Sequence, residues 1–225
     1  MKSAIRLASN WYFRAEARAF PPTGGALKRF FDIVGASAGL LLLGPLFLMI
    51  ALLIKLTDGG SIFYGHTRIG HNGNEFSCLK FRTMVQDGER ILDEYLARHP
   101  ALRQEWEETR KLKNDPRVTR VGAVLRKLSL DELPQLFNIM RGDMSMVGPR
   151  PVVDEELSYY GRAAQYYLRS RPGLTGLWQI SGRNDVSYDS RVAFDRHYVE
   201  NWSFGRDVWI IVRTVPAVCA QRGSY

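Results

Sequence analysis

The pattern of hydrophobic and polar positions contains one long apolar run. It extends from Ile33 to Ile54 without a charged residue, and a run of this length predicts a helix that enters a lipid bilayer. A buried core helix is the alternative, although such helices are usually shorter. The run begins well inside the chain and lacks a small-residue cleavage site, so it does not have the form of a cleaved signal peptide.

The pair Gly44 and Pro45 divides this run near its middle. A proline inside a helix removes a hydrogen bond and clashes with the preceding turn, so we expect a kink at these two residues. Each arm of the helix would be about 18 Å long, whereas the hydrocarbon core of a bilayer is about 30 Å thick. One arm alone therefore reaches little beyond one leaflet.

Basic residues flank the apolar run on both sides, whereas a spanning helix usually has them on one side only. The flanking residues are Arg14, Arg18, Lys28 and Arg29 before the run, and Lys55, Arg68, Lys80 and Arg82 after it. We therefore predict a kinked, re-entrant helix with both ends on the cytoplasmic side. A single span remains the alternative, because kinked helices also cross membranes.

The rest of the chain has the patterns of short strands and amphipathic helices. Ser61–Tyr64 and Glu75–Phe81 alternate around the turn residues Gly70 and Asn72-Gly73, which predicts a β-hairpin. Three further segments have apolar positions at helical spacing. They are 87–113, interrupted at Pro100, followed by 132–141 and 153–168.

These elements predict an α/β fold with a mostly helical cytosolic domain and short strands. The expected organisation is a flexible N-terminal tail over residues 1–26, a membrane-inserted re-entrant helix over 27–57, and the cytosolic domain over 58–225. An apolar cluster near the end of the chain fits core packing and membrane-surface binding equally well. Its members are Trp202, Phe204, Trp209, Ile210, Ile211 and Val212.

Composition adds a class of partner to this picture. The 225-residue chain carries a formal charge of +8 with 45% hydrophobic residues, which is the balance of a folded, basic protein. The charge points to an anionic partner: nucleic acid, anionic lipid or a phosphorylated small molecule. Cys78, Cys219 and the four histidines have no metal-ligand spacing, which argues against a structural zinc site or a disulfide scaffold.

The adjacent acids Asp131 and Glu132 stand at a predicted helix start. Ser129 and Glu132 have capping-box spacing, which is the structural interpretation. In the catalytic interpretation, free backbone N–H groups with Arg126 and Lys127 keep Asp131 ionised and bring an anionic phosphate close to it. A carboxylate can attack phosphorus, and two neighbouring carboxylates can hold Mg²⁺ together with a diphosphate.

Basic residues also recur beside glycine, proline or an aromatic residue. They occur in Lys80-Phe-Arg82, Gly148-Pro-Arg150-Pro and Ser181-Gly-Arg183-Asn. Arginine offers paired donors to phosphate oxygens, so these residues, with the acid pair and the membrane helix, indicate a membrane enzyme that handles phosphate esters. The chain contains no glycine-rich Walker loop, which excludes a P-loop nucleotide site.

Four segments carry a family resemblance. KRFFD at 28–32, KFRTM at 80–84, LRKLSLDELPQLFNIMRGDMSMVGPRP at 125–151 and RPGLTGLWQISGRN at 171–184 together resemble the bacterial sugar transferases. These are monotopic polyprenyl-phosphate phosphoglycosyl transferases that begin exopolysaccharide and O-antigen assembly. The resemblance runs from about Lys28 to the end of the chain, and it is strongest to the galactose-1-phosphate transferases that initiate exopolysaccharide synthesis. The family's helix usually breaks at Ser-Pro, whereas this chain has Gly44-Pro45.

The resemblance implies a specific reaction. A sugar 1-phosphate, galactose 1-phosphate by resemblance alone, passes from a UDP-sugar to undecaprenyl phosphate, and UMP is released. The expected location is the cytoplasmic face of the bacterial inner membrane, in contact with membrane lipid, and Mg²⁺ is the expected cofactor.

The resemblance also implies roles for individual residues. Asp131 is the nucleophile that forms a covalent phosphosugar intermediate, and Glu132 assists proton transfer or metal organisation, so both are candidate metal ligands. Five basic residues are expected to bind the diphosphate, the polyprenyl phosphate or the uridine. They are Lys80, Arg82, Arg126, Arg150 and Arg183.

Two rival functions remain at this stage. A basic membrane-surface scaffold of a polysaccharide assembly complex would need no catalysis, and neutralising Asp131 would then change little. A nucleic-acid binder would leave the apolar helix unexplained, so no nucleic-acid partner is expected. The sequence leaves the oligomeric state open, and a homo-oligomer is compatible with it.

Overall fold

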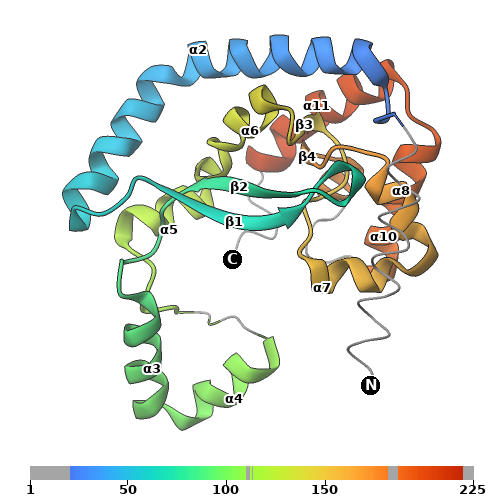
Figure 1. Cartoon of the computed structure of the whole chain (residues 1–225). Coiled ribbons are helices and arrows are strands. Elements are labelled where there is room, and N and C mark those ends of the chain that lie inside the picture. Colours follow the sequence, from blue (N-terminus) through green and yellow to red (C-terminus); the bar gives the residue numbers. More distant parts are fainter. Residues whose placement is uncertain (1–20, 110–111, 113, 182–186, 220–225) are drawn as a thin grey trace.

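The computed structural model describes residues 21–109, 112, 114–181 and 187–219. In these residues helices predominate, and the strands form two sheets of two strands each (Figure 1). This agrees with the expected mixture of many helices and short strands. The predicted tail over residues 1–26 lies mostly outside the described residues.

Helix α2, Gly25–Asp58, contains the apolar run and is long and apolar enough to cross a membrane. It is continuous through Pro45, so the proline does not end the helix. Figure 1 shows the ribbon running along the top of the molecule and then turning downwards toward the C-terminal end of α2. The re-entrant membrane topology stays a prediction.

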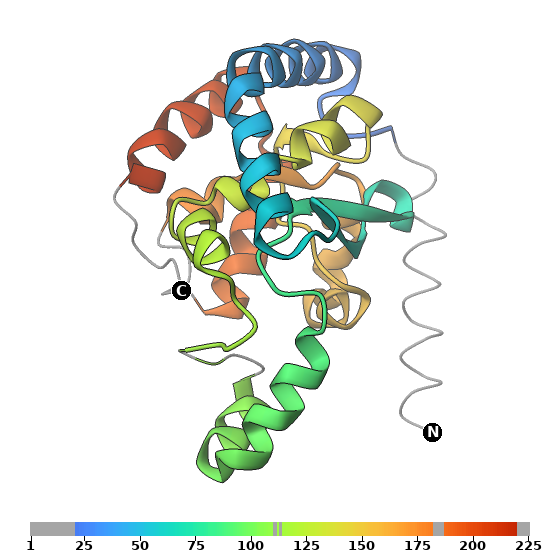
Figure 2. The ribbon, with the colours of Figure 1, turned by 90° about the vertical axis from the view of Figure 1, so that its left-hand side faces the viewer.

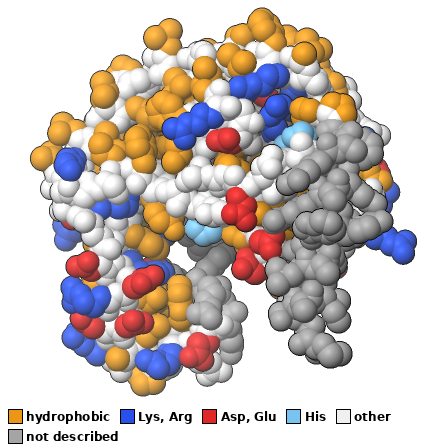
Figure 3. Space-filling model, viewed as in Figure 1, with side chains coloured by type: hydrophobic (Ala, Val, Ile, Leu, Met, Phe, Trp, Pro, Cys, Tyr) orange, Lys and Arg blue, Asp and Glu red, His pale blue; other side chains and the backbone are white. Residues whose placement is uncertain are grey.

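One side of α2 packs on the catalytic domain. Its buried apolar residues join a core cluster that also contains Phe81 of strand β2, Glu75–Phe81, and Ile139 of helix α6, Gln135–Arg141. The α2 residues in that cluster are Ala36, Phe47, Ile50 and Ile54. The opposite side exposes large apolar side chains, including Leu41, Leu42, Leu48 and Leu56, and Figure 3 shows apolar side chains gathered along the top of the molecule. This helix is therefore both a core element and an apolar surface.

The predicted hairpin is present, but its first strand begins two residues later and extends five residues further than the predicted 61–64 segment. Strand β1, Phe63–Ile69, pairs antiparallel with β2, Glu75–Phe81. The connecting turn, η1, spans His71–Gly73, and Asn72 there has φ +60°. Asparagine tolerates this left-handed conformation better than most residues, which explains the tight reversal.

The helical segments agree with expectation in part. Helices α3, Gly88–Arg98, and α4, Pro100–Thr109, are separated before Pro100 as predicted. The expected helix over 153–168 is wrong as a single element, because Gly161 has φ +50° and interrupts it. It consists of α7, Asp154–Leu157, then η3, Ser158–Ala163, and α8, Ala164–Leu168.

The C-terminal part covers the second sheet. Strands β3, Ser145–Val147, and β4, Gly173–Thr175, are parallel. They are followed by α9, Leu177–Ile180, then α10, Tyr188–Glu200, and α11, Phe204–Cys219.

Helix α11 combines the two interpretations of the C-terminal apolar cluster. Ile210 is fully buried, whereas Val208, Trp209 and Val212 are exposed. The ring centres of Phe204 and Phe31, the latter on α2, are 4.1 Å apart. Figure 2 shows that α11 begins near α2 and then runs away from it. The same helix therefore packs in the core and presents an apolar outer surface.

Candidate active site

The acid pair lies between α5 and α6. Helix α5, Arg120–Lys127, is capped by Thr119, whose hydroxyl accepts a hydrogen bond of 2.8 Å from the Gly122 N–H. A Cβ at Gly122 would come within 2.1 Å of the Thr83 carbonyl oxygen. Glycine is thus required for α5 to approach the backbone just beyond β2, and this contact brings the acid pair to the hairpin.

The capping-box interpretation of Ser129 is wrong. Ser129 has φ +55° and its side chain caps no backbone N–H. The acids lie in a short 3₁₀ turn, η2, Leu130–Glu132, while α6 spans Gln135–Arg141. A left-handed serine costs conformational energy, and such strain is common at functional sites.

Lys80 of β2 connects the two acids. Its Nζ lies 2.6 Å from Glu132 Oε1 and 3.6 Å from Asp131 Oδ2. Asp131 is buried, whereas Glu132 and Lys80 keep part of their side chains in solvent. Lys80 and the pair Asp131 and Glu132, which lie about fifty residues apart in the sequence, therefore form one ionic cluster.

Burial and neighbouring charges shift the pKa values of Asp131 and Lys80. It raises the pKa of Asp131, and the Glu132 charge adds to the rise, while Lys80 and Arg126 oppose it. Arg126 acts in the expected direction, but burial outweighs it, so the pKa of Asp131 lies above its ordinary value. Burial lowers the pKa of Lys80, but the two carboxylates outweigh burial and raise it overall. Lys80 is consequently a stable cation beside the acids.

The other predicted basic residues have different surroundings. Arg126 donates from Nε to Thr83 Oγ1 over 2.9 Å, close to the acid pair. Arg82 is 90% buried and is held in an ion pair and hydrogen bond by Asp58, the last residue of α2. Arg183 lies outside the described residues. The contact of Arg82 is structural, and its role as a phosphate ligand stays a prediction.

Arg150 extends the basic surface toward α9 and α10. Its guanidinium lies 5.4 Å from the ring centre of Trp178. Burial raises the pKa of the Cys78 thiol to about 11, and the charges of Lys80, Arg68 and Arg150 only partly oppose this. The role of Arg150 as a phosphate ligand stays a prediction.

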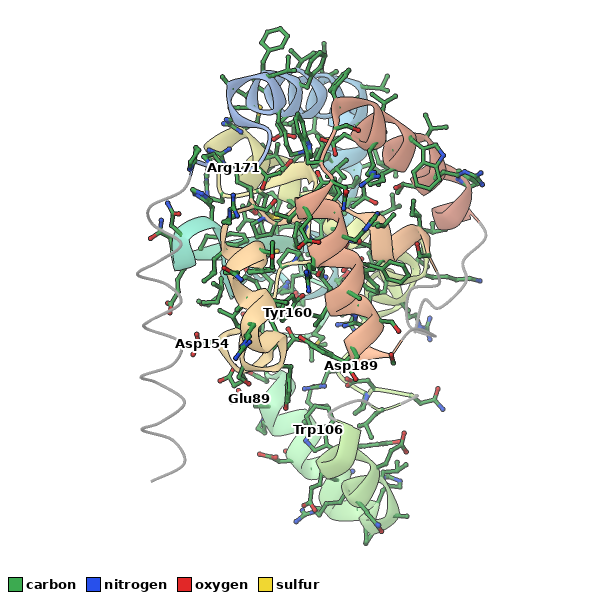
Figure 4. The ribbon with its side chains drawn as sticks, turned by 90° about the vertical axis from the view of Figure 1, so that its right-hand side faces the viewer. Glu89, Trp106, Asp154, Tyr160, Arg171 and Asp189 are labelled. Atoms are coloured by element: carbon green, nitrogen blue, oxygen red, sulfur yellow. The ribbon has the colours of Figure 1, made fainter. Side chains whose placement is uncertain are left out.

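A buried polar pair lies behind this region. The Tyr160 hydroxyl donates to Asp195 Oδ2 over 2.7 Å, and Figure 4 shows Tyr160 beside α10. On the same helix, the Arg191 guanidinium lies 4.4 Å from the ring centre of Trp178. These residues form an arginine and aromatic layer next to Arg150.

The acid pair fits a magnesium ion shared with a substrate. No group of three or more His, Cys, Asp or Glu side chains forms a metal site within the described ranges. Mg²⁺ commonly takes one or two carboxylates and fills its remaining positions with phosphate oxygens and water. Asp131 and Glu132 supply two such carboxylates, so the donor set suits Mg²⁺ only when a phosphate completes it.

Sequence reasoning missed three side chains on the face that carries Lys80. The strand register sets Tyr64 opposite Lys80, His66 opposite Cys78, and Arg68 opposite Phe76, so Tyr64, His66 and Arg68 share that face. The alternating pattern of residues 61–64 and 75–81 predicted the hairpin. It did not show which residues of the two strands pair, so these neighbours of Lys80 could not be identified.

Comparison with known proteins bears directly on this geometry. The family model described as "Bacterial sugar transferase" matches residues 23–221, a range that includes α2, the hairpin and the acid pair. The exopolysaccharide production protein ExoY of Rhizobium meliloti (strain 1021) is 64% identical over the full length of both chains.

Two longer relatives have names that specify a substrate. The undecaprenyl-phosphate galactose phosphotransferase of Salmonella typhimurium is 54% identical, and the UDP-galactose-lipid carrier transferase of Erwinia amylovora is 51% identical. Each match covers 88% of this chain and 42% of the relative. The similarity therefore lies in the part of those proteins that corresponds to α2 and the domain below it.

Proposed function

The chain belongs to the bacterial sugar transferase family and is a phosphoglycosyl transferase, and we propose that it transfers galactose 1-phosphate from UDP-galactose to undecaprenyl phosphate. The transfer releases UMP and is the first membrane step of exopolysaccharide synthesis. The names of the Salmonella typhimurium and Erwinia amylovora relatives support galactose and the lipid acceptor, and that of the Rhizobium meliloti relative supports exopolysaccharide synthesis.

The observation that carries this proposal is the cluster of Asp131, Glu132 and Lys80. A buried carboxylate stands beside a permanent cation, with Lys80 Nζ 3.6 Å from Asp131 Oδ2. The cation can neutralise charge on a diphosphate, while the carboxylate can attack phosphorus. Capping, the other interpretation of the acid pair, has lost its support because Ser129 makes no capping bond.

The proposed chemistry has two steps. An Asp131 carboxylate oxygen attacks the phosphorus that carries the sugar, the P–O bond to the UMP phosphate breaks, and UMP leaves. An oxygen of undecaprenyl phosphate then attacks the same phosphorus, and the bond to Asp131 breaks. Lys80 and Arg126 stabilise negative charge on the transferred group in both steps, and Glu132 orients the attacking group or accepts a proton.

We further propose that Asp131 and Glu132 bind Mg²⁺ together with the donor diphosphate, where the ion would neutralise charge on the phosphate oxygens. The apolar outer surface of α2 supports contact with membrane lipid. A helix inserted from the cytoplasmic side would keep the catalytic domain near both the soluble donor and the head group of the lipid acceptor. Homo-oligomer formation stays a prediction.

Purified protein in detergent, with Mg²⁺, undecaprenyl phosphate and a panel of UDP-sugars, tests the proposal. We expect UMP release and a galactose phospholipid product with UDP-galactose, and neither with Asp131→Asn. Transfer from UDP-glucose alone would replace galactose with glucose in the proposal. A wild-type protein that binds vesicles but releases no UMP with any donor would favour the scaffold function instead.

A further inference from the structure

An aromatic side chain lies directly beside the catalytic lysine. In the hairpin register, Tyr64 of β1 is opposite Lys80 of β2. Side chains opposite one another on antiparallel strands share a face, with Cβ atoms about 4.5–5.5 Å apart. Because the Lys80 ammonium contacts Asp131 and Glu132, Tyr64 stands on the face from which the reaction proceeds.

The edge of β2 that faces away from β1 is covered near Lys80. Asn138 of α6 donates from Nδ2 to the Ser77 carbonyl over 2.8 Å, and its Oδ1 accepts from the Leu79 N–H over 2.9 Å. On the other edge lies β1, where Tyr64 keeps 53% of its surface exposed.

His66 continues this aromatic wall along β1. Its ring centre lies 6.3 Å from that of Tyr64. The His66 Nδ1 atom is shielded from solvent and has no hydrogen-bond partner among the described residues. Buried polar atoms of this kind normally have a partner, and leaving one unpaired costs free energy. A rotation of the imidazole that brings Nδ1 to the surface would let a ligand hydroxyl supply the bond.

We propose that Tyr64 stacks against the hexose ring of the UDP-sugar donor and that His66 Nδ1 hydrogen-bonds one of its hydroxyl groups. The inference rests on the proposed function, because it places the sugar-bearing phosphorus at Asp131. The hexose is joined to that phosphorus through one oxygen, so it must lie next to the acid pair. Tyr64, opposite Lys80, offers an exposed aromatic ring next to that position.

The chemistry of a hexose matches this wall. A tyrosine ring has a negative face, which attracts the polarised C–H groups of a sugar. In galactose the axial 4-hydroxyl leaves the C3, C4 and C5 hydrogens together on one ring face, whereas glucose separates them. Tyr64 can therefore distinguish the two hexoses by stacking, while His66 fixes the rotation of the bound ring through a single hydroxyl.

Steady-state kinetics of the full-length protein with UDP-galactose and undecaprenyl phosphate tests the inference. For Tyr64→Ala we expect kcat/KM for UDP-galactose to fall about tenfold. The inhibition constant of UDP, which lacks the hexose, should stay within about twofold of the wild-type value. Tyr64→Phe should retain activity because it keeps the ring, and Tyr64→Leu should lose it while preserving apolar bulk for folding.

His66→Ala should likewise lower kcat/KM for UDP-galactose and leave the inhibition constant of UDP unchanged. The matched control is Tyr95→Ala, which removes a tyrosine ring on α3 that contacts His99 and lies outside the hairpin. Unchanged kinetics in Tyr64→Ala and Tyr64→Leu would overturn the inference, as would an equal loss of UDP binding. A wild-type protein without transfer activity would instead refute the proposed function itself.

Discussion

The Lys28 ammonium lies 2.6 Å from Asp207 Oδ2, although 179 residues separate them, and both side chains are almost fully buried. Asp207 also accepts hydrogen bonds from the Tyr198 hydroxyl and the Trp202 indole N–H. The beginning of α2 is therefore joined to α11 by a desolvated charge pair whose carboxylate is shared by three donors.

Breaking this pair should destabilise the fold. Lys28→Met leaves the Asp207 charge buried and without its cation, so we expect the free energy of unfolding to fall by about 3–5 kcal/mol. Adding Asp207→Asn removes the unpaired charge and should recover part of the loss. Denaturant unfolding in detergent measures both, with Lys127→Met at an exposed lysine as the control. Equal stability of Lys28→Met and the control would contradict the prediction.

Two-step catalysis predicts a burst of UMP without the lipid acceptor. With Mg²⁺ and UDP-galactose, the wild type should release about one equivalent of UMP per active site, and intact-mass analysis should detect a sugar-phosphate adduct. Asp131→Asn should lose both, since an amide is a poor nucleophile. Glu132→Gln should retain a slow first step if Glu132 acts as a base. Initial-rate lines that intersect for the two substrates would favour direct attack by the lipid.

The re-entrant topology predicts that both ends of α2 lie in the cytoplasm. Single cysteines at Thr23 and Asn72, in a chain lacking Cys78 and Cys219, should both resist an impermeant thiol reagent in intact cells. Both should react after the cells are opened, which is the control for accessibility. Labelling of the Thr23 position alone in intact cells would establish a spanning helix.

Asp195 predicts a pH dependence of stability. Burial raises its pKa to about 7, and the Tyr160 hydrogen bond and the charge of Arg191 only partly oppose this. Its unfolded pKa is about 3.9, so between about pH 4 and 7 the folded protein holds a proton that the unfolded chain has lost. This contribution to stability is complete below pH 4 and is lost as the pH rises through 7.

Asp195→Asn keeps an acceptor for Tyr160 but cannot ionise. Relative to the wild type, it should therefore gain about 4 kcal/mol of stability as the pH rises from 4 to 8, because the two pKa values differ by about three units and each unit corresponds to about 1.4 kcal/mol. Thermal melting across this range measures the difference. A difference that does not change with pH would show that Asp195 ionises normally in the folded protein.

The ion pair of Arg82 with Asp58 predicts a structural effect. Arg82→Ala and Asp58→Ala should each lower the melting temperature by a similar amount, and the double variant should lose little more, because both remove the same contact. Melting curves combined with transfer assays separate this role from phosphate binding. If Arg82→Ala abolishes transfer while Asp58→Ala leaves it intact, phosphate binding is its main contribution.

Local signals explain which elements could be predicted from the sequence. The hairpin follows from alternation around Asn72-Gly73, and the break between α3 and α4 follows from Pro100. Both depend on a few adjacent residues, where conformational preference dominates. The helix expected over 153–168 was wrong because one glycine, Gly161, adopts a positive φ within an otherwise helical pattern.

The parts that could not be predicted depend on contacts between distant segments. Ser129 and Glu132 have capping-box spacing, yet tertiary packing holds Ser129 in a left-handed conformation. Motif resemblance pointed to Lys80 and Asp131, but their contact depends on α5 packing beside β2. Tyr64 and His66 had no motif at all, because only the pairing register shows that they share a face with Lys80.

The buried side of α2 has a consequence for how the enzyme can be made and handled. A truncated protein that lacks α2 would expose the buried side chains of Phe81 and Ile139 to solvent. It would also leave the Asp207 carboxylate without its counter-ion. Such a fragment should aggregate rather than remain in solution. Folding follows the same logic: the domain can complete its interior only when α2 packs on it, so the helix and the domain should fold as one unit.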